Sequence, residues 1–125
     1  MSTRCNVGIV NEDGSITAIY CHHDGYIKGP FGVGYTLYNY YNSEDKAQDL
    51  VNNGSTSSIK HTLEETIAYD DGFNLHIHFK DIQDYLENAA DDIDYLYLWN
   101  DNAWHVFGLL GDIEGWYPVK YFIIS

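Results

Sequence analysis

The sequence predicts a single α+β domain, residues 1–125, in which an antiparallel sheet of about six strands carries two to three short helices on one side. Three observations support this prediction. Alternating, β-branched segments are joined by tight turns, other segments have apolar residues at helical spacing, and neither a linker nor a repeat of fixed period divides the chain. A parallel, doubly wound fold is disfavoured, because parallel strands cannot be joined by tight turns.

The first two strands are predicted to form a hairpin. Residues 4–10 and 15–22 alternate between apolar and polar side chains, and an Asn-Glu-Asp-Gly sequence separates them. Asp-Gly supplies the positive φ angles of a tight turn, so residues 12–14 are the expected loop. A loop of this length places Cys5 opposite Cys21, on an apolar face that the core would cover.

Two short helices follow a flexible loop. Residues 25–34 contain four glycines and a proline, which is typical of a loop. Apolar residues then recur at helical spacing in residues 33–41. Ser43 is the expected N-cap of a second helix over residues 44–53, and Gly54 is expected to end it.

The second half of the chain is predicted to hold a strand at residues 74–79, a third helix at 80–92, a second hairpin at 94–109 and a last strand at 115–124. Residues 65–69 are an ambiguous strand. Asp81 is the expected N-cap of the third helix. Pro118 confines the last strand to an edge or a bulge, because proline cannot donate to a neighbouring strand.

The charge excludes direct binding to nucleic acid. The net charge is −13, from 19 acidic and 6 basic residues. The cations are scattered singly, as Arg4, Lys28, Lys46, Lys60, Lys80 and Lys120. A nucleic-acid-binding protein needs clustered cations for the phosphates, so the expected charged partner is a positively charged protein surface.

The sequence also predicts a cytosolic protein. No apolar run approaches the ~20 residues that span a bilayer, and the first residues lack the apolar core of a signal peptide. Cys5 and Cys21 are then expected to be reduced, as small buried hydrophobic residues. The oligomeric state stays open, and edge strands with many aromatic residues make a homodimer compatible with the sequence.

The heptapeptide Tyr-Cys-His-His-Asp-Gly-Tyr at residues 20–26 combines a thiol, two imidazoles and a carboxylate. Strand alternation places His22 and His23 on opposite faces, which divides this cluster. Asp24 and the glycine after it form a turn signal, and a turn gives the aspartate a local hydrogen-bonding role. We therefore interpret the heptapeptide as a strand end with a turn.

Metal and enzyme sites have weaker signals, and no cofactor is predicted. His76 and His78 would point the same way from one strand, as two zinc ligands often do, and Cys5, Cys21 and His23 could form a trio. Both sets lack the spacing of a known metal motif. No nucleophile or phosphate-loop motif is present, so a small metal-binding enzyme stays an alternative without a mechanism.

A ligand pocket is a further alternative. Aromatic residues near the loop at residues 24–34 could stack on a nucleotide-like ring, namely Tyr35, Tyr38, Tyr40 and Tyr41. The chain would then sequester a nucleotide second messenger of a defence system. The shortage of cations for phosphate groups argues against this alternative.

The residues Ser-Thr-Arg at 2–4, the segment 18–26 and the segment 32–58 resemble a family of small proteins common in phages and prophages. That family has a Met-Ser/Gly-Thr-Arg start, an Ile-Tyr-Cys-His-Trp-Asp-Gly-Tyr segment and a Gly-Val-Gly sequence before a helix. His23 replaces the family's usual Trp, and residues 29–31 read like an insertion. The resemblance brings no site residues, but it implies a viral or mobile-element context.

An acidic segment supplies the candidate contact surface. Asp81, Asp84, Glu87 and Asp91 recur every three or four residues, which places them on one helix face. Like charges at this spacing destabilise a helix, so the row is either a solvated face or an imitation of a phosphate backbone. The expected function is inhibition of a host defence protein, of the anti-CRISPR or anti-restriction type, through the residues Asp81, Asp84, Glu87, Asp91, Asp92, Asp94, Tyr95, Tyr97, Trp99 and Asp101.

Overall fold

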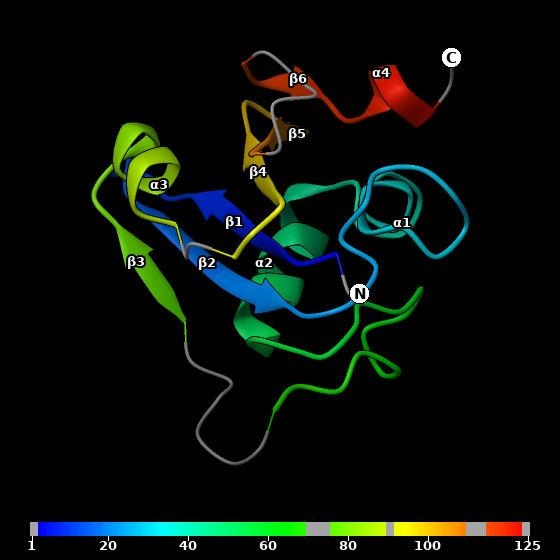
Figure 1. Cartoon of the computed structure of the whole chain (residues 1–125). Helices are drawn as coiled ribbons and strands as arrows, with labels where there is room; N and C mark the ends of the chain where they lie inside the picture. The colour runs from blue at the N-terminus through cyan, green and yellow to red at the C-terminus, as the bar shows by residue number, and fades with distance from the viewer. Residues whose placement is uncertain (1–2, 70–75, 90–91, 110–114, 124–125) are drawn as a thin grey trace.

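The computed structural model describes residues 3–69, 76–89, 92–109 and 115–123, and it confirms the α+β class (Figure 1). Along the chain the elements are β1 (Cys5–Val10), β2 (Ile16–Cys21), α1 (Val33–Tyr40), α2 (Glu44–Asn53), β3 (Ile77–Phe79), α3 (Ile82–Asn88), β4 (Tyr95–Asn100), β5 (Ala103–Gly108), β6 (Tyr117–Pro118) and α4 (Lys120–Ile123). Within the described residues the strands form a six-stranded sheet in the order β3-β2-β1-β4-β5-β6.

The hairpin of β1 and β2 has the predicted register. The Asn11 backbone N–H donates to the Ser15 carbonyl at 2.8 Å, which closes the turn. Gly14 adopts a φ of 88° inside it, a left-handed conformation that glycine accepts without strain. Cys5 lies opposite Cys21, as predicted from the loop length.

The second hairpin, of β4 and β5, is also confirmed. Asn100 pairs with Ala103, so Asp101 and Asn102 form a two-residue turn. Their φ angles are 53° and 62°, the left-handed values that a hairpin turn of this length needs at both positions. Asp and Asn accept these angles more readily than other residues that carry a Cβ.

One strand pairing differs from the predicted antiparallel sheet. β1 and β4 run parallel, with Cys5 opposite Tyr95 and Ile9 opposite Trp99, whereas the remaining pairings are antiparallel. Between β2 and β4 the chain passes through α1, α2, β3 and α3 before it returns in the direction of β1. Parallel pairing requires a long crossover of this kind, and the tight turns in the sequence give no sign of it.

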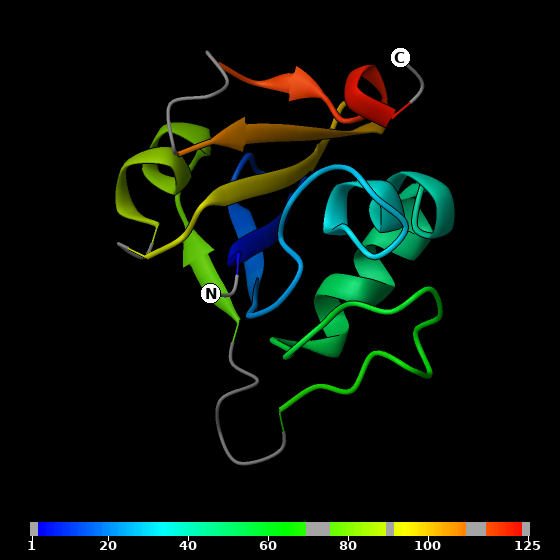
Figure 2. The same cartoon turned by 45° about the vertical axis from the view of Figure 1, so that its right-hand side comes forward.

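Helices cover both faces of the sheet, and not the single side that the sequence predicts. Val7 lies in a core cluster with Leu37 of α1 and Leu50 of α2. Leu96, on the opposite face, lies in a second cluster with Tyr85 of α3. Figure 2 shows α1 and α2 on one side of the sheet and α3 on the other. The apolar spacing within α3 predicts which side of the helix is buried, but it carries no information about which face of the sheet the helix covers.

Side chains cap the helices as the sequence predicts. Ser43 Oγ accepts a hydrogen bond from the Lys46 backbone N–H at 3.3 Å at the start of α2, and Gly54 follows its end with a φ of 97°. Asp81 caps α3. The third helix is shorter than the predicted 80–92, because the chain becomes extended at Ala89.

The predicted last strand, at 115–124, is largely wrong. β6 has two residues and pairs with β5 at the edge of the sheet, and α4 follows it. Pro118 has no N–H to donate, in keeping with its place on the edge strand. The Val119 N–H still donates to the Trp104 carbonyl of β5, and the Phe122 N–H then donates to the Val119 carbonyl in the turn that begins α4.

Two weaker predictions have partial outcomes. The ambiguous strand at 65–69 is reduced to an isolated bridge between Thr56 and Ala68. The strand at 74–79 is present as β3, and residues 74 and 75 lie outside the described part of the chain. No helix in the described ranges combines the length and apolarity that crossing a bilayer demands.

Candidate functional site

The heptapeptide at residues 20–26 is the end of β2 followed by a turn, as interpreted. Cys21 is buried, and the Tyr20 hydroxyl lies 2.6 Å from His22 Nδ1. Asp24 adopts a φ of 62°. The Gly25 backbone N–H donates to the Thr3 carbonyl at 2.8 Å, and its carbonyl accepts a hydrogen bond from the Tyr97 hydroxyl at 2.7 Å. These contacts give the segment a structural role.

The two thiols are buried together on the face of the sheet that holds Val7 and that α1 and α2 cover. Cys5 and Cys21 are both fully buried and free of a disulfide. Burial raises the pKa of the Cys5 thiol well above its ordinary value. The hydrogen bond with Cys5 lowers the pKa of the Cys21 thiol. Both thiols are fully buried, so a substrate in solvent does not reach either of them.

The histidines proposed as metal ligands have separate hydrogen-bond partners. His76 Nε2 donates to the Val51 carbonyl at 2.6 Å, and His78 Nδ1 lies 3.5 Å from Thr17 Oγ1. Across the part of the chain that the structure describes, no group of three or more His, Cys, Asp or Glu side chains could hold a metal ion.

The carboxylates of α3 have roles in the helix that the sequence interpretation overlooks. Asp81 accepts a hydrogen bond from the Asp84 backbone N–H at 2.8 Å, and Asp84 accepts from the Lys80 backbone N–H at 2.8 Å. This pair resembles a capping box, and both charges favour the positive end of the helix dipole. The Lys80 hydrogen bond lowers the pKa of Asp84. Glu87 accepts from Gln83 within the helix at 2.7 Å.

The predicted row of four carboxylates on one helix face is therefore wrong in part. α3 ends at Asn88, and Asp91 lies outside the described residues. The spacing of the row suggests that it destabilises the helix. The structure corrects this for Asp81 and Asp84, because they lie at the N-cap and in the first turn, where carboxylates stabilise a helix.

Replacing Asp81 with alanine is expected to lower the free energy of unfolding by about 1 kcal/mol, since it removes the N-cap of α3. Glu87→Ala is the matched control, and it should change the free energy by less than about 0.5 kcal/mol because that side chain is exposed. Urea denaturation followed by circular dichroism measures both. Equal losses in the two variants would contradict a capping role for Asp81.

Asp92 and Asp94 hold the start of the chain against β4. Asp92 forms an ion pair with the Arg4 guanidinium at 3.0 Å. The Asp94 carboxylate accepts from the Arg4 backbone N–H at 3.1 Å, and the Asp94 backbone N–H donates to the Arg4 carbonyl at 2.9 Å. These bonds fix β1 in register with β4.

The predicted aromatic anchors are largely inside the protein. Tyr97 is fully buried and Trp99 is 4% exposed, so neither can contact a partner, which corrects that prediction. Tyr85 of α3 is fully buried as well, and its hydroxyl donates to the Tyr97 carbonyl at 2.9 Å. Tyr95 is partly buried against the same core as Tyr97. The alternation of side chains along β4 does not indicate which of them are buried, because helices cover both faces of the sheet.

Carboxylates gather at one end of the sheet. Ile16 lies opposite both Val10 and Phe79, and Ile9 lies opposite Trp99. The turns after β1, β3 and β4 are therefore at the same end. We call the carboxylates at these turns the acidic end, which comprises Glu12, Asp13, Asp81, Asp84 and Asp101.

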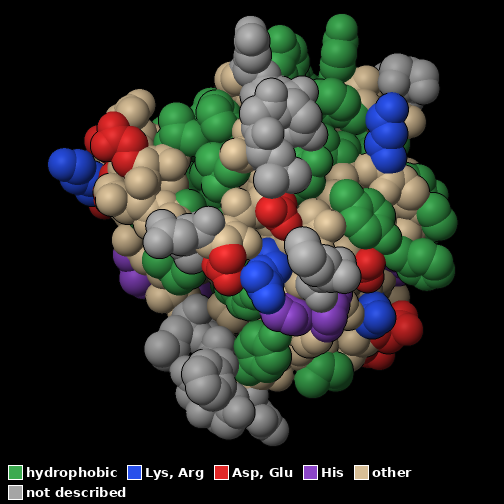
Figure 3. All heavy atoms as spheres, in the orientation of Figure 1, with side chains coloured by type: hydrophobic (Ala, Val, Ile, Leu, Met, Phe, Trp, Pro, Cys, Tyr) green, Lys and Arg blue, Asp and Glu red, His purple; other side chains and the backbone are tan. Residues whose placement is uncertain are grey.

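Sequence reasoning misses part of this cluster. The sequence predicts a surface over residues 81–101, and the register adds Glu12 and Asp13 to it. The first-hairpin turn is the available signal, but only the parallel pairing of β1 with β4 brings that turn beside Asp101. Figure 3 shows the molecule in the orientation of Figure 1, where the red acidic patches in view are small and separated by other side chains.

The predicted tyrosine pocket is divided in the structure. Tyr40 stacks on His61, with ring centroids 4.1 Å apart and planes 9° apart, and Tyr35 lies 6.5 Å from the same ring. Tyr41 is buried, and its hydroxyl donates to the Lys60 carbonyl at 2.8 Å. Tyr38 lines a separate cavity near Asp101.

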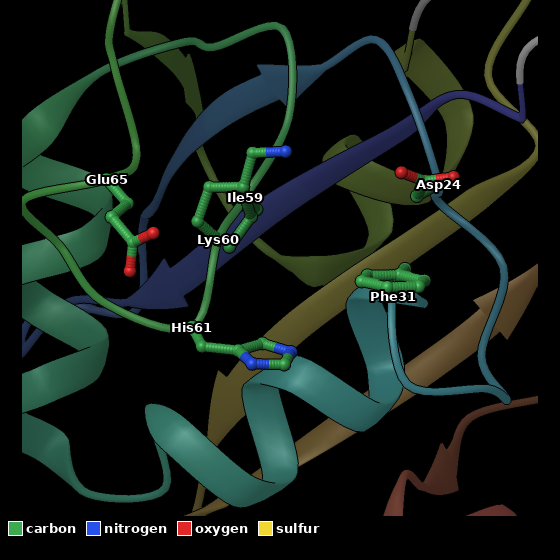
Figure 4. Close-up of a pocket in the computed structure, with 6 residues that line it drawn as sticks. All are labelled: Asp24, Phe31, Ile59, Lys60, His61 and Glu65. Carbon is green, nitrogen blue, oxygen red and sulfur yellow. The ribbon is translucent and has the colours of Figure 1, made fainter.

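Next to the Tyr40–His61 stack is a cleft between residues 24–31 and residues 59–65, with a volume of about 290 Å³. Its lining residues are Asp24, Phe31, Ile59, Lys60, His61 and Glu65 (Figure 4). Asp24 is the residue of the heptapeptide that lines it. The sequence predicts the first of these segments as a possible pocket wall but gives no sign of the second.

Comparison of the chain with known protein families, with curated proteins and with solved structures gave no match.

Proposed function

We propose that the chain is a phage- or prophage-encoded inhibitor that acts in the host cytoplasm by binding a defence protein at its cationic nucleic-acid-binding surface. The observation that carries the proposal is the acidic end, where the strand register gathers carboxylates from three turns. The net charge of −13 supports it, because such a field speeds association with a basic surface.

The acidic end is suited to imitating a phosphate backbone. The turns that carry it are separated by up to three strand spacings, which is roughly 15 Å. Glu12, Asp13, Asp81 and Asp101 are exposed there. CRISPR effector complexes and restriction enzymes are the leading candidate targets, since they hold nucleic acid in positively charged channels.

The test uses a double variant at the acidic end, Glu12→Lys with Asp101→Asn. Asparagine tolerates the φ of 53° at position 101, so the turn is preserved. The chain serves as bait in lysates of host cells that carry a defence system, and association with the captured nucleic-acid-binding protein is then timed. We expect the variant to associate about tenfold more slowly and with weaker dependence on salt.

A matched control changes the net charge equally on other exposed residues, Glu64→Lys with Asp49→Asn. The control is expected to associate at close to the original rate. Equal slowing in both double variants would mean that only the total charge matters. An unchanged rate in the Glu12/Asp101 variant would refute the acidic end as the contact surface.

A further inference from the structure

The cleft between residues 24–31 and 59–65 has two walls that are joined at its base. His61 Nε2 donates to the Pro30 carbonyl at 2.9 Å, which ties one segment to the other. The Lys60 backbone N–H donates to Thr66 Oγ1 at 2.9 Å, so the second wall is also fixed. Figure 4 shows Asp24 and Phe31 on one wall, with Ile59 and Lys60 across from them. The cleft is thus formed before any ligand binds.

An exposed aromatic ring lies in this cleft. Phe31 is 70% exposed, whereas Ile59 on the opposite wall is 5% exposed and adds an apolar contact. A phenylalanine ring in contact with water loses the benefit of burial, so its exposure inside a cavity suits a ligand that covers it. A planar ring that stacks on its face is such a ligand.

The charged groups of the cleft are available to a ligand. Lys60 is exposed, and none of the described carboxylates forms an ion pair with it. The Asp24 Oδ1 atom accepts a hydrogen bond from the Tyr26 hydroxyl at 3.1 Å, while no described residue donates to Oδ2. Glu65 likewise accepts one hydrogen bond, from Thr62 Oγ1 at 2.9 Å. Each carboxylate keeps lone pairs for a ligand, and Asp24 lies on the wall opposite Lys60.

We propose that this cleft binds a nucleoside monophosphate, with the base stacked on Phe31, the donor edge of the base at Asp24 and the phosphate at Lys60. A carboxylate can only accept hydrogen bonds, so it selects a base with two adjacent N–H donors, which is guanine. Adenine presents an acceptor beside its amino group and fits a carboxylate less well.

The size and charge of the cleft select a monophosphate. A volume of about 290 Å³ is at the lower end of ligand sites and suits a single nucleotide. Lys60 is the one lysine or arginine among the lining residues, and it can form an ion pair with one phosphate group. A triphosphate would bring further charge into a protein with a net charge of −13.

The test is calorimetric titration of the full chain with GMP, AMP, GTP and guanosine. GMP is expected to bind most tightly. Phe31→Ala should weaken GMP binding about tenfold, the loss of one stacking contact. Ile67→Ala is the matched control, because Ile67 is 71% exposed and lies outside the cleft, and it should leave the affinity unchanged. Thermal melting confirms that both variants are folded.

Two further variants test the assigned contacts. Lys60→Met should reduce the affinity for GMP to that for guanosine. Asp24→Asn keeps a residue that tolerates the φ of 62°, and it should remove the preference for GMP over AMP. Absence of GMP binding at about 10 mM, or equal binding by Phe31→Ala, would overturn the proposal. Tighter binding of N-acetylarginine amide than of GMP would also overturn it, in favour of a partner's cationic side chain.

Discussion

Replacing Trp99 with alanine is expected to lower the free energy of unfolding by about 3–5 kcal/mol, the typical loss for a large aromatic residue in a core. Trp99 is 4% exposed and packs edge-to-face on Trp104, with ring centroids 5.4 Å apart. It lies opposite Ile9 in the parallel pair of strands, so the cavity would open between the sheet and the helices. Chemical denaturation followed by circular dichroism measures the loss.

The control is Tyr121→Ala, because the Tyr121 side chain is also a large aromatic but is 65% exposed. Its expected effect is within about 0.5 kcal/mol. The comparison decides between a core role for Trp99 and the contact role that the sequence suggests. A Trp99→Ala protein that is as stable as the Tyr121→Ala protein would contradict the core role.

A second large effect is expected from Gly25→Ala, at about 3 kcal/mol of unfolding free energy, the upper range for overpacking. A Cβ atom at this position would lie 2.8 Å from the Thr3 carbonyl oxygen and 3.0 Å from the Arg4 carbonyl carbon. Both contacts are with backbone, which cannot rotate away as a side chain can. Moving the turn would also disturb the hydrogen bond from the Tyr97 hydroxyl to the Gly25 carbonyl.

Gly14→Ala separates this effect from backbone strain. Gly14 has a φ of 88°, and beyond its chain neighbours no atom lies within 4 Å of the place that an alanine methyl group would take, so alanine there meets strain but no clash. The expected loss is about 1–2 kcal/mol. Thermal and urea denaturation of both variants provide the comparison. A smaller loss for Gly25→Ala than for Gly14→Ala would show that the turn relaxes easily.

Features set by neighbours in the sequence could be predicted. The register of the first hairpin follows from its loop, and the ends of α2 follow from Ser43 and Gly54. The pairing of β1 with β4 could not be predicted, because it joins residues whose positions differ by 90. The same limit explains the misassigned faces of α3 and of Trp99, since burial on both sides depends on the complete sheet.

The candidate sites follow the same rule. The loop that carries Asp24 and Phe31 has a sequence signature of glycine and proline, which makes it a predictable pocket wall. The opposite wall is irregular chain without periodicity, and its contact to the loop is a single hydrogen bond from His61 to Pro30, separated by 31 positions. The acidic end likewise depends on strand order, which the distribution of charge along the chain does not contain.

The position of β1 has a consequence for synthesis on the ribosome. β1 is near the start of the chain and lies inside the sheet between β2 and β4. Translation delivers β2 directly after β1, but β4 emerges only after α1, α2, β3 and α3 have been made. Until then one side of β1 has unpaired backbone groups and can pair with other chains. Completion of the sheet therefore waits until β4 has been made, and contacts this distant in sequence are typical of slow folding.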